Sequence, residues 1–158
     1  MEMFDRISVM NRARLAKLRV RDRQVIQEAH ELFGKFKNHP LFIAGIALYW
    51  AEGTRLDKSG RRFQLALTNS DPKLLKFYCK FLKLYFKIIK KSQLRGALFL
   101  HRDINNKNAI TYWLRTLCVP RTQFIKTQIL PTRGAQKRKL HFGTCCVYVN
   151  SKHACLTM

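Results

Sequence analysis

Acidic residues are scarce in this chain of 158 residues. Nine Asp and Glu stand against 31 Lys and Arg, which gives a formal net charge of +22. A surface with so much charge of one sign repels itself unless a polyanion neutralises it, so the shortage of acids favours a nucleic-acid partner. The basic residues run from Arg6 to Lys152 and form no single tail beside an apolar helix, which argues against an anionic membrane. We expect neither a membrane nor a small-molecule substrate as the partner.

Long apolar segments are absent as well. The uncharged run at residues 41–51 holds eleven residues, whereas a helix that spans a bilayer needs about 20 apolar residues. The first forty residues are polar and contain no apolar segment of the kind found in signal peptides. We therefore expect an intracellular protein, cytoplasmic or associated with the nucleoid, and not a secreted one.

Cysteine pairs at metal-binding spacing are missing too. A zinc cluster can be imagined only from the following residues near the C-terminus: His141, Cys145, Cys146, His153 and Cys155. Two of these cysteines are adjacent, and adjacent residues of a strand point to opposite faces, so we do not expect structural zinc. Five scattered cysteines also form no disulfide framework, which fits a reducing compartment.

With 47% hydrophobic residues, the chain holds enough apolar side chains to fold around one core. We expect residues 1–38, which carry nine Lys and Arg, to form a basic helical arm, and residues 39–158 to form one domain. Strands are expected at residues 61–68, 94–101, 123–130 and 144–149, and helices at 41–52, after Pro72 and at 105–117. The predicted fold class is α+β, with an antiparallel sheet and helices packed on one face.

The uncharged run predicts a buried helix that starts near Pro40 and ends at Gly53. Small or apolar side chains lie on one of its faces at spacings of three and four residues: Ala44, Ala47, Leu48 and Ala51. Such a face lets another helix approach closely. The partner is an element of the same core, the same helix of a second chain, or a pseudo-symmetric equivalent of this helix.

Glu52 ends this helix, at the terminus where the helix dipole disfavours negative charge. The other acids beyond residue 31 have expected structural roles: Asp57 in a turn, Asp71 as the N-cap of the next helix, and Asp103 as a cap for the helix at 105–117. Glu52 is therefore free for a metal or phosphate site. Because Mg²⁺ is usually held by one or two carboxylates plus substrate phosphates, a symmetric dimer that pairs two copies of Glu52 would suit it.

Two segments carry a resemblance to a known family. Residues 45–53 read GIALYWAEG, and residues 67–71 read LTNSD after the predicted strand. Together they resemble the LAGLIDADG homing endonuclease family over roughly residues 41–130. Gly45, Ile46 and Trp50 depart from the usual motif residues.

The resemblance implies a saddle-shaped sheet that lies in the major groove of double-stranded DNA, in a homodimer whose motif helices pair. It implies that Glu52 binds Mg²⁺ for cleavage, that Asn69 assists the attacking water, and that Lys126 is the basic residue near the end of the domain. Ala47 and Ala51 match the small positions of the helix interface. The residues expected to read or position DNA are Arg61, Arg62, Gln64, Thr68 and Arg95.

Two further functions stay open. The same fold resembles bacterial transcription regulators that bind DNA without cutting it, and residues 1–38 would then be the remnant of a linker to a helix-turn-helix domain. Glu52 would in that case be a buried hydrogen-bond acceptor or a leftover. An RNA-binding role, such as assistance in intron splicing, is the third possibility, although Phe77, Tyr78 and Phe81 are expected in the core and not on a stacking surface.

Overall fold

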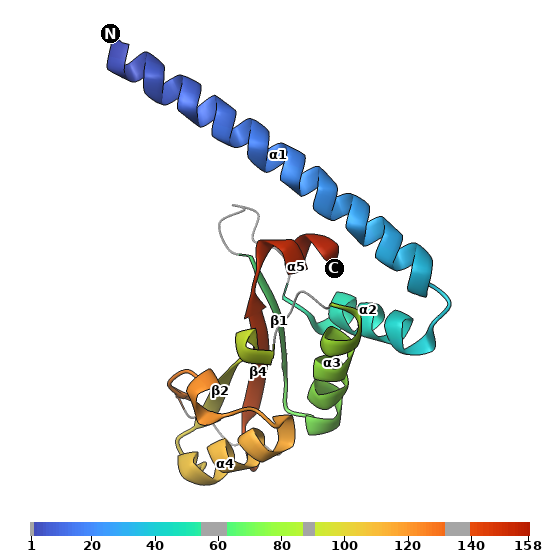
Figure 1. The fold of residues 1–158 in the computed structure, drawn as a ribbon. Coiled ribbons are helices and arrows are strands. Elements are labelled where there is room, and N and C mark those ends of the chain that lie inside the picture. Colours follow the sequence, from blue (N-terminus) through green and yellow to red (C-terminus); the bar gives the residue numbers. More distant parts are fainter. Residues whose placement is uncertain (1, 55–62, 87–90, 132–139) are drawn as a thin grey trace.

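The computed structural model describes residues 2–54, 63–86, 91–131 and 140–158 (Figure 1). The predicted turn at Asp57 and the predicted DNA contacts Arg61 and Arg62 lie outside these residues. The chain folds as α+β, as predicted. Its helices are α1 (Glu2–Phe36), α2 (Pro40–Glu52), α3 (Pro72–Tyr85), α4 (Asn106–Leu117) and α5 (Lys152–Thr157). Its strands are β1 (Gln64–Asn69), β2 (Arg95–His101), β3 (Gln128–Leu130) and β4 (Thr144–Asn150), and short 3₁₀ turns cover Lys91–Gln93 and Arg121–Gln123.

The four strands form one mixed sheet in the order β1-β4-β2-β3. Strand β4 runs antiparallel to both of its neighbours, whereas β3 runs parallel to β2. The prediction of a wholly antiparallel sheet was therefore wrong. A parallel neighbour needs a long crossover connection, and α4 supplies it between β2 and β3.

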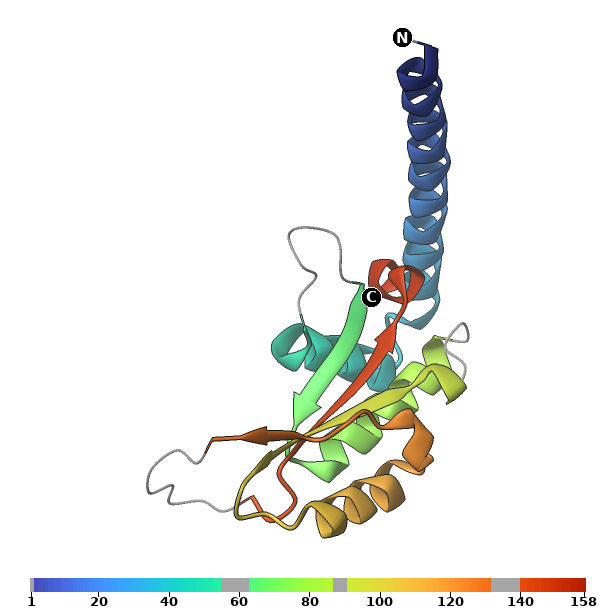
Figure 2. The same cartoon turned by 90° about the vertical axis from the view of Figure 1, so that its left-hand side faces the viewer.

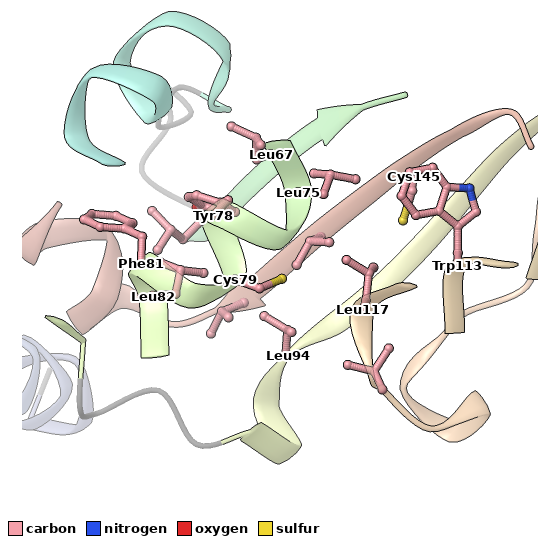
Figure 3. Close-up of a cluster of buried hydrophobic side chains, with 14 of the residues drawn as sticks. Leu67, Leu75, Tyr78, Cys79, Phe81, Leu82, Leu94, Trp113, Leu117 and Cys145 are labelled. Carbon is pink, nitrogen blue, oxygen red and sulfur yellow. The ribbon is translucent and has the colours of Figure 1, made fainter. Parts of the chain in front are cut away.

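The main core lies between one face of the sheet and the helices. Alternate residues of the strands, such as Leu67 and Cys145, point toward α3 and α4 and meet Phe81 and Trp113 there (Figure 3). The indole of Trp113 also donates a hydrogen bond to the carbonyl of Phe142, at 2.8 Å. The opposite face carries a smaller apolar cluster, formed by Ala66, Ala97, Cys146 and Tyr148.

Side-chain caps fix where α3 and α4 begin. Asp71 accepts a hydrogen bond from the backbone of Lys73 at 2.7 Å, so its predicted capping role is correct. The cap of α4 is Asn105, which accepts from the backbone of Asn108 at 3.0 Å. The prediction that Asp103 caps this helix was wrong, because the chain enters the helix two residues later. Asp103 is exposed, so Glu52 is not alone in lacking a capping role.

Helix α2 packs with one side only. Phe42 and Gly45 are its buried residues, and a Cβ added at Gly45 would lie 2.1 Å from Cδ2 of Phe81 in α3. Glycine thus permits the close approach of the two helices. The expectation of a buried helix is therefore correct for one side only, because the side opposite Gly45 is exposed in the described part of a single chain.

Helix α1 is 35 residues long, and only its C-terminal part rests on the domain (Figure 2). Val25 is buried, and two ion pairs join α1 to α5. Lys152 lies 2.6 Å from Asp22, and His153 lies 3.0 Å from Glu28. Both views show the N-terminal part of α1 projecting past the rest of the molecule. None of the helices in the described part of the chain combines the length and apolar character that a membrane crossing requires.

Candidate nucleic-acid interface

Glu52 is the last residue of α2 and is exposed. The chain then turns directly into contact with β1, because Gly53 pairs with Leu67 and the amide of Thr54 donates to the carbonyl of Ala66 at 2.8 Å. Tyr49 holds the turn by donating its hydroxyl hydrogen bond to the carbonyl of Thr54 at 2.6 Å. Burial raises the pKa of Tyr49 to about 12, so this hydroxyl stays a donor at neutral pH. The carboxylate is therefore carried on a fixed junction of helix and sheet.

The free side of α2 carries an apolar surface, and Glu52 follows the last residue of this surface in the chain. It consists of Ile43, Ala44, Ala47, Trp50 and Ala51, all of them exposed, and we call it the α2 face. Trp50 is 85% exposed and Ile43 is 40% exposed. Of the four residues predicted to form an interface, Ala44, Ala47 and Ala51 lie on this face, whereas Leu48 packs partly against the core.

Sequence reasoning missed Ile43 and Trp50 as members of this face. Both lie at helical spacing from the alanines, three or four residues from Ala47, so the signal was present. Both belong to the run predicted as a buried helix, and bulky apolar side chains are usually buried.

The predicted DNA contacts within the described residues share the sheet face that points away from α3 and α4. The register places Gln64 opposite Asn150, Thr68 opposite Cys146, and Arg95 opposite Tyr148. Gln64 donates to the Oδ1 atom of Asn150 at 3.1 Å, and Arg95 reaches the carbonyl of Thr122 at 3.4 Å. Amide, hydroxyl and guanidinium groups on one sheet face are suited to contacts with base edges and phosphates.

The three predicted catalytic residues do not all come together. Asn69 ends β1, two residues past the partner of Gly53, and so lies at the same edge of the sheet as Glu52. Its Oδ1 atom accepts a hydrogen bond from the amide of Asp71 at 2.9 Å. Lys126 is exposed and precedes β3, at the opposite edge. Since β4 and β2 lie between the two edge strands, the separation is three strand spacings, or about 14 Å.

A single chain offers few ligands for a metal ion. Within the described ranges, no group of three or more His, Cys, Asp or Glu side chains is placed to hold one. Glu52 fits Mg²⁺ only if a second copy brings another carboxylate and DNA brings phosphates. The adjacent Cys145 and Cys146 point to opposite faces of β4, and burial raises the pKa of both thiols, which keeps them protonated.

The described basic side chains gather on helices more than on the sheet. On the outer sheet face, Arg95 is the only Lys or Arg that the structure describes. Helix α3 exposes Lys73, Lys76, Lys80 and Lys83, and α1 exposes Arg12, Arg14, Lys17, Arg19, Arg21 and Arg23. The positive surface of the described residues is therefore dominated by helices.

Comparison with protein-family models, with curated proteins and with solved structures gave no match to the chain.

Proposed function

We propose that this chain binds double-stranded DNA as a homodimer and hydrolyses phosphodiester bonds with the help of Mg²⁺, in the manner of a LAGLIDADG-like endonuclease. The observation that carries the proposal is the position of Glu52, an exposed carboxylate at the C-terminal end of α2, the helix that carries the apolar α2 face. The net charge of +22 supports a polyanion as the partner.

Dimerisation follows from the chemistry of the α2 face. An apolar stripe of about 100° on a helix is normally packed against another element, and this one is exposed in a single chain. The alanines allow two copies of the helix to approach closely, and Trp50 and Ile43 add apolar area at the sides. If the two-fold axis runs along the helices, the two copies of α2 lie parallel, and the two Glu52 carboxylates come to the same end of the interface.

Paired Glu52 carboxylates would hold Mg²⁺ against a phosphate of the bound duplex, and the chemistry that the ion would supply there is polarisation of the phosphate and a lower pKa for an attacking water. Asn69 lies at the same sheet edge and offers its Nδ2 group as a donor to that water, because its Oδ1 atom already accepts from Asp71. Gln64, Thr68 and Arg95 would contact the bases and backbone from the outer sheet face.

The test uses the full chain, Mg²⁺ and a supercoiled plasmid that carries the DNA flanking its gene. We expect Glu52→Gln to lower the cleavage rate by at least about 10³-fold, because metal-ion stabilisation is worth several kcal/mol. Affinity for the same DNA should stay within a few-fold of the wild type. Asp103→Asn removes the same charge from an exposed position away from α2, so it is the matched control and should cut normally. Equal cleavage by Glu52→Gln and wild type would refute the catalytic proposal.

Two observations favour a second function. Lys126 lies at the sheet edge opposite Glu52, and the Oδ1 atom of Asn69 is used in a turn, so a single chain assembles only part of the expected catalytic set. Under this alternative the protein binds DNA through the same surfaces and regulates transcription without cutting. A plasmid that is bound tightly but stays intact with Mg²⁺, Mn²⁺ and Ca²⁺ would select this alternative.

A further inference from the structure

The N-terminal half of α1 is a helix without a covering element in the described structure. Every side chain from Val9 to Arg21 is exposed, and the ion pairs and buried contacts that seat α1 begin at Asp22 and Val25. Both ribbon views show this segment extending beyond the body of the molecule (Figures 1 and 2). Thirteen exposed residues at a rise of 1.5 Å form a rod of about 20 Å.

Basic side chains occupy two opposite flanks of this rod. At 3.6 residues per turn, one flank carries Arg12, Arg19 and Arg23, and the other carries Arg14, Lys17 and Arg21. Between the flanks, on the side away from the buried Val25, lie only small or apolar residues: Val9, Ala13, Ala16 and Val20. The acid of this segment, Asp22, is paired with Lys152. The rod thus has a narrow neutral face between two positive flanks.

We infer that residues 9–23 of α1 lie in the major groove of a DNA duplex, an inference that rests on the proposed function as a DNA-binding protein. The major groove is about 12 Å wide, so it admits one helix, and its two walls are the phosphate backbones of the two strands. Each basic flank then meets one wall. The neutral face meets the floor, where Ala and Val methyl groups contact thymine methyl groups and no acid opposes the phosphates.

Pairing of this rod with a second copy explains the pattern less well. Helices that pair carry complementary charges beside their apolar seam, whereas both flanks here are positive and would repel their copies. A merely solvated helix requires no separation of its charges into two flanks about a neutral face. The groove of a polyanion accounts for both the two positive flanks and the neutral face between them.

The test measures how the affinity of the full chain for a DNA duplex changes with salt. The slope of log K against log salt is negative, and each lost phosphate contact reduces its magnitude by about 0.9. Arg12→Gln/Arg19→Gln/Arg23→Gln should therefore reduce the magnitude by about 2.7. The triple variant of the other flank, Arg14→Gln/Lys17→Gln/Arg21→Gln, should do the same. Gln keeps a high helix propensity, and circular dichroism verifies that α1 is intact.

A matched control removes the same charge from α3. Lys73→Gln/Lys76→Gln/Lys80→Gln takes three exposed lysines from α3, which packs on the sheet face opposite the predicted DNA contacts, and we expect its slope to stay within about 0.9 of the wild type. Equal losses for the α1 and α3 variants would show that only overall charge matters and would overturn the inference. An unchanged slope in both α1 variants would overturn it as well.

The groove itself is tested with duplex RNA of the same sequence. The major groove of A-form RNA is deep and narrow and does not admit a helix, so the α1 variants should lose much less slope on RNA than on DNA. Equal losses on both duplexes would overturn the groove assignment. Absence of salt-dependent DNA binding in the wild type would refute the proposed function, whereas normal binding with insensitive α1 variants would refute this inference alone.

Discussion

Helices α1 and α2 both expose a long side, but the two sides differ in chemistry. From Val9 to Arg21 every residue of α1 is exposed, and six Lys and Arg line its flanks through Arg23. On α2 the exposed residues before Glu52 are apolar, and Trp50 has 85% of its surface exposed. A charged helix is stable in water beside the domain that seats it. Exposure of an apolar helix face to water is unfavourable, and the chain becomes more stable when another apolar surface covers that face.

The difference separates two kinds of recognition in one small chain. Contacts made by α1 would be electrostatic, so they should weaken with salt, whereas contacts made by the α2 face should depend little on salt. DNA affinity and self-association are therefore expected to respond to different substitutions. The predictions below test this separation, beginning with the largest expected effect.

Substitution of an alanine by Glu should have opposite effects on the two helices. In α2, Ala47→Glu would place an unpaired carboxylate in the proposed dimer interface, at a cost of about 3 kcal/mol, which would raise the dimer dissociation constant roughly 150-fold. In α1, Ala16→Glu should leave the dimer unchanged and weaken DNA binding. Sedimentation equilibrium measures the dimer dissociation constant, and a binding titration measures the affinity for DNA. A dimer that survives Ala47→Glu, or dissociates with Ala16→Glu, would break the comparison.

The sequence was sufficient to predict features of the fold that depend on neighbouring residues. Asp71 and Pro72 start α3 as predicted, and Gly53 ends α2 as predicted, because caps and helix ends are set by local hydrogen bonds. Features that depend on distant residues were less accessible. Strand β3 pairs in parallel with β2, and whether a strand runs parallel is decided by the path of α4 and not by the residues of the strand.

The candidate site shows the same limit. Glu52 was placed at the end of its helix because Gly53 follows it, but the exposure of Trp50 was not predicted. The run at 41–51 is apolar on all sides, so its composition does not tell which side the protein covers. That choice is made by Gly45, which admits the ring of Phe81 and turns the opposite side outward. The separation of Lys126 from Glu52 likewise follows from the strand order and not from spacing in the chain.

Two glycines test how closely each helix is packed. A Cβ at Gly45 of α2 would overlap the ring of Phe81, whereas one at Gly34 of α1 would meet no described atom within 4 Å. We expect Gly45→Ala to lower the free energy of unfolding by about 1–3 kcal/mol, and Gly34→Ala to raise it by roughly 0.5–1 kcal/mol, because alanine is favoured in helices. Urea unfolding measures both values. An increase in the free energy of unfolding on Gly45→Ala would mean that α2 does not pack closely against α3 at this position.

The smallest expected effect concerns α3 and α5, the helices that contact α2 and α1 respectively. Cys79 lies in α3, the helix that contacts α2, and Cys155 lies in α5, the helix that contacts α1; burial raises the pKa of each thiol from 9.0 to about 11. Because the folded state favours the protonated thiol, this stabilisation is complete below pH 9 and is lost as the pH rises toward 11.

Between pH 8 and pH 10, the wild type should lose about 1 kcal/mol more stability than Cys79→Ala, measured by urea unfolding under reducing conditions. Cys155→Ala should reduce the pH dependence in the same direction. If only Cys155→Ala does so, the pH-sensitive burial lies in α5 alone, and α3 admits more water to Cys79 than its 4% exposure implies. Equal responses would show that both helices rest on layers that exclude water, and that α1 and α2 differ only in what their free sides offer.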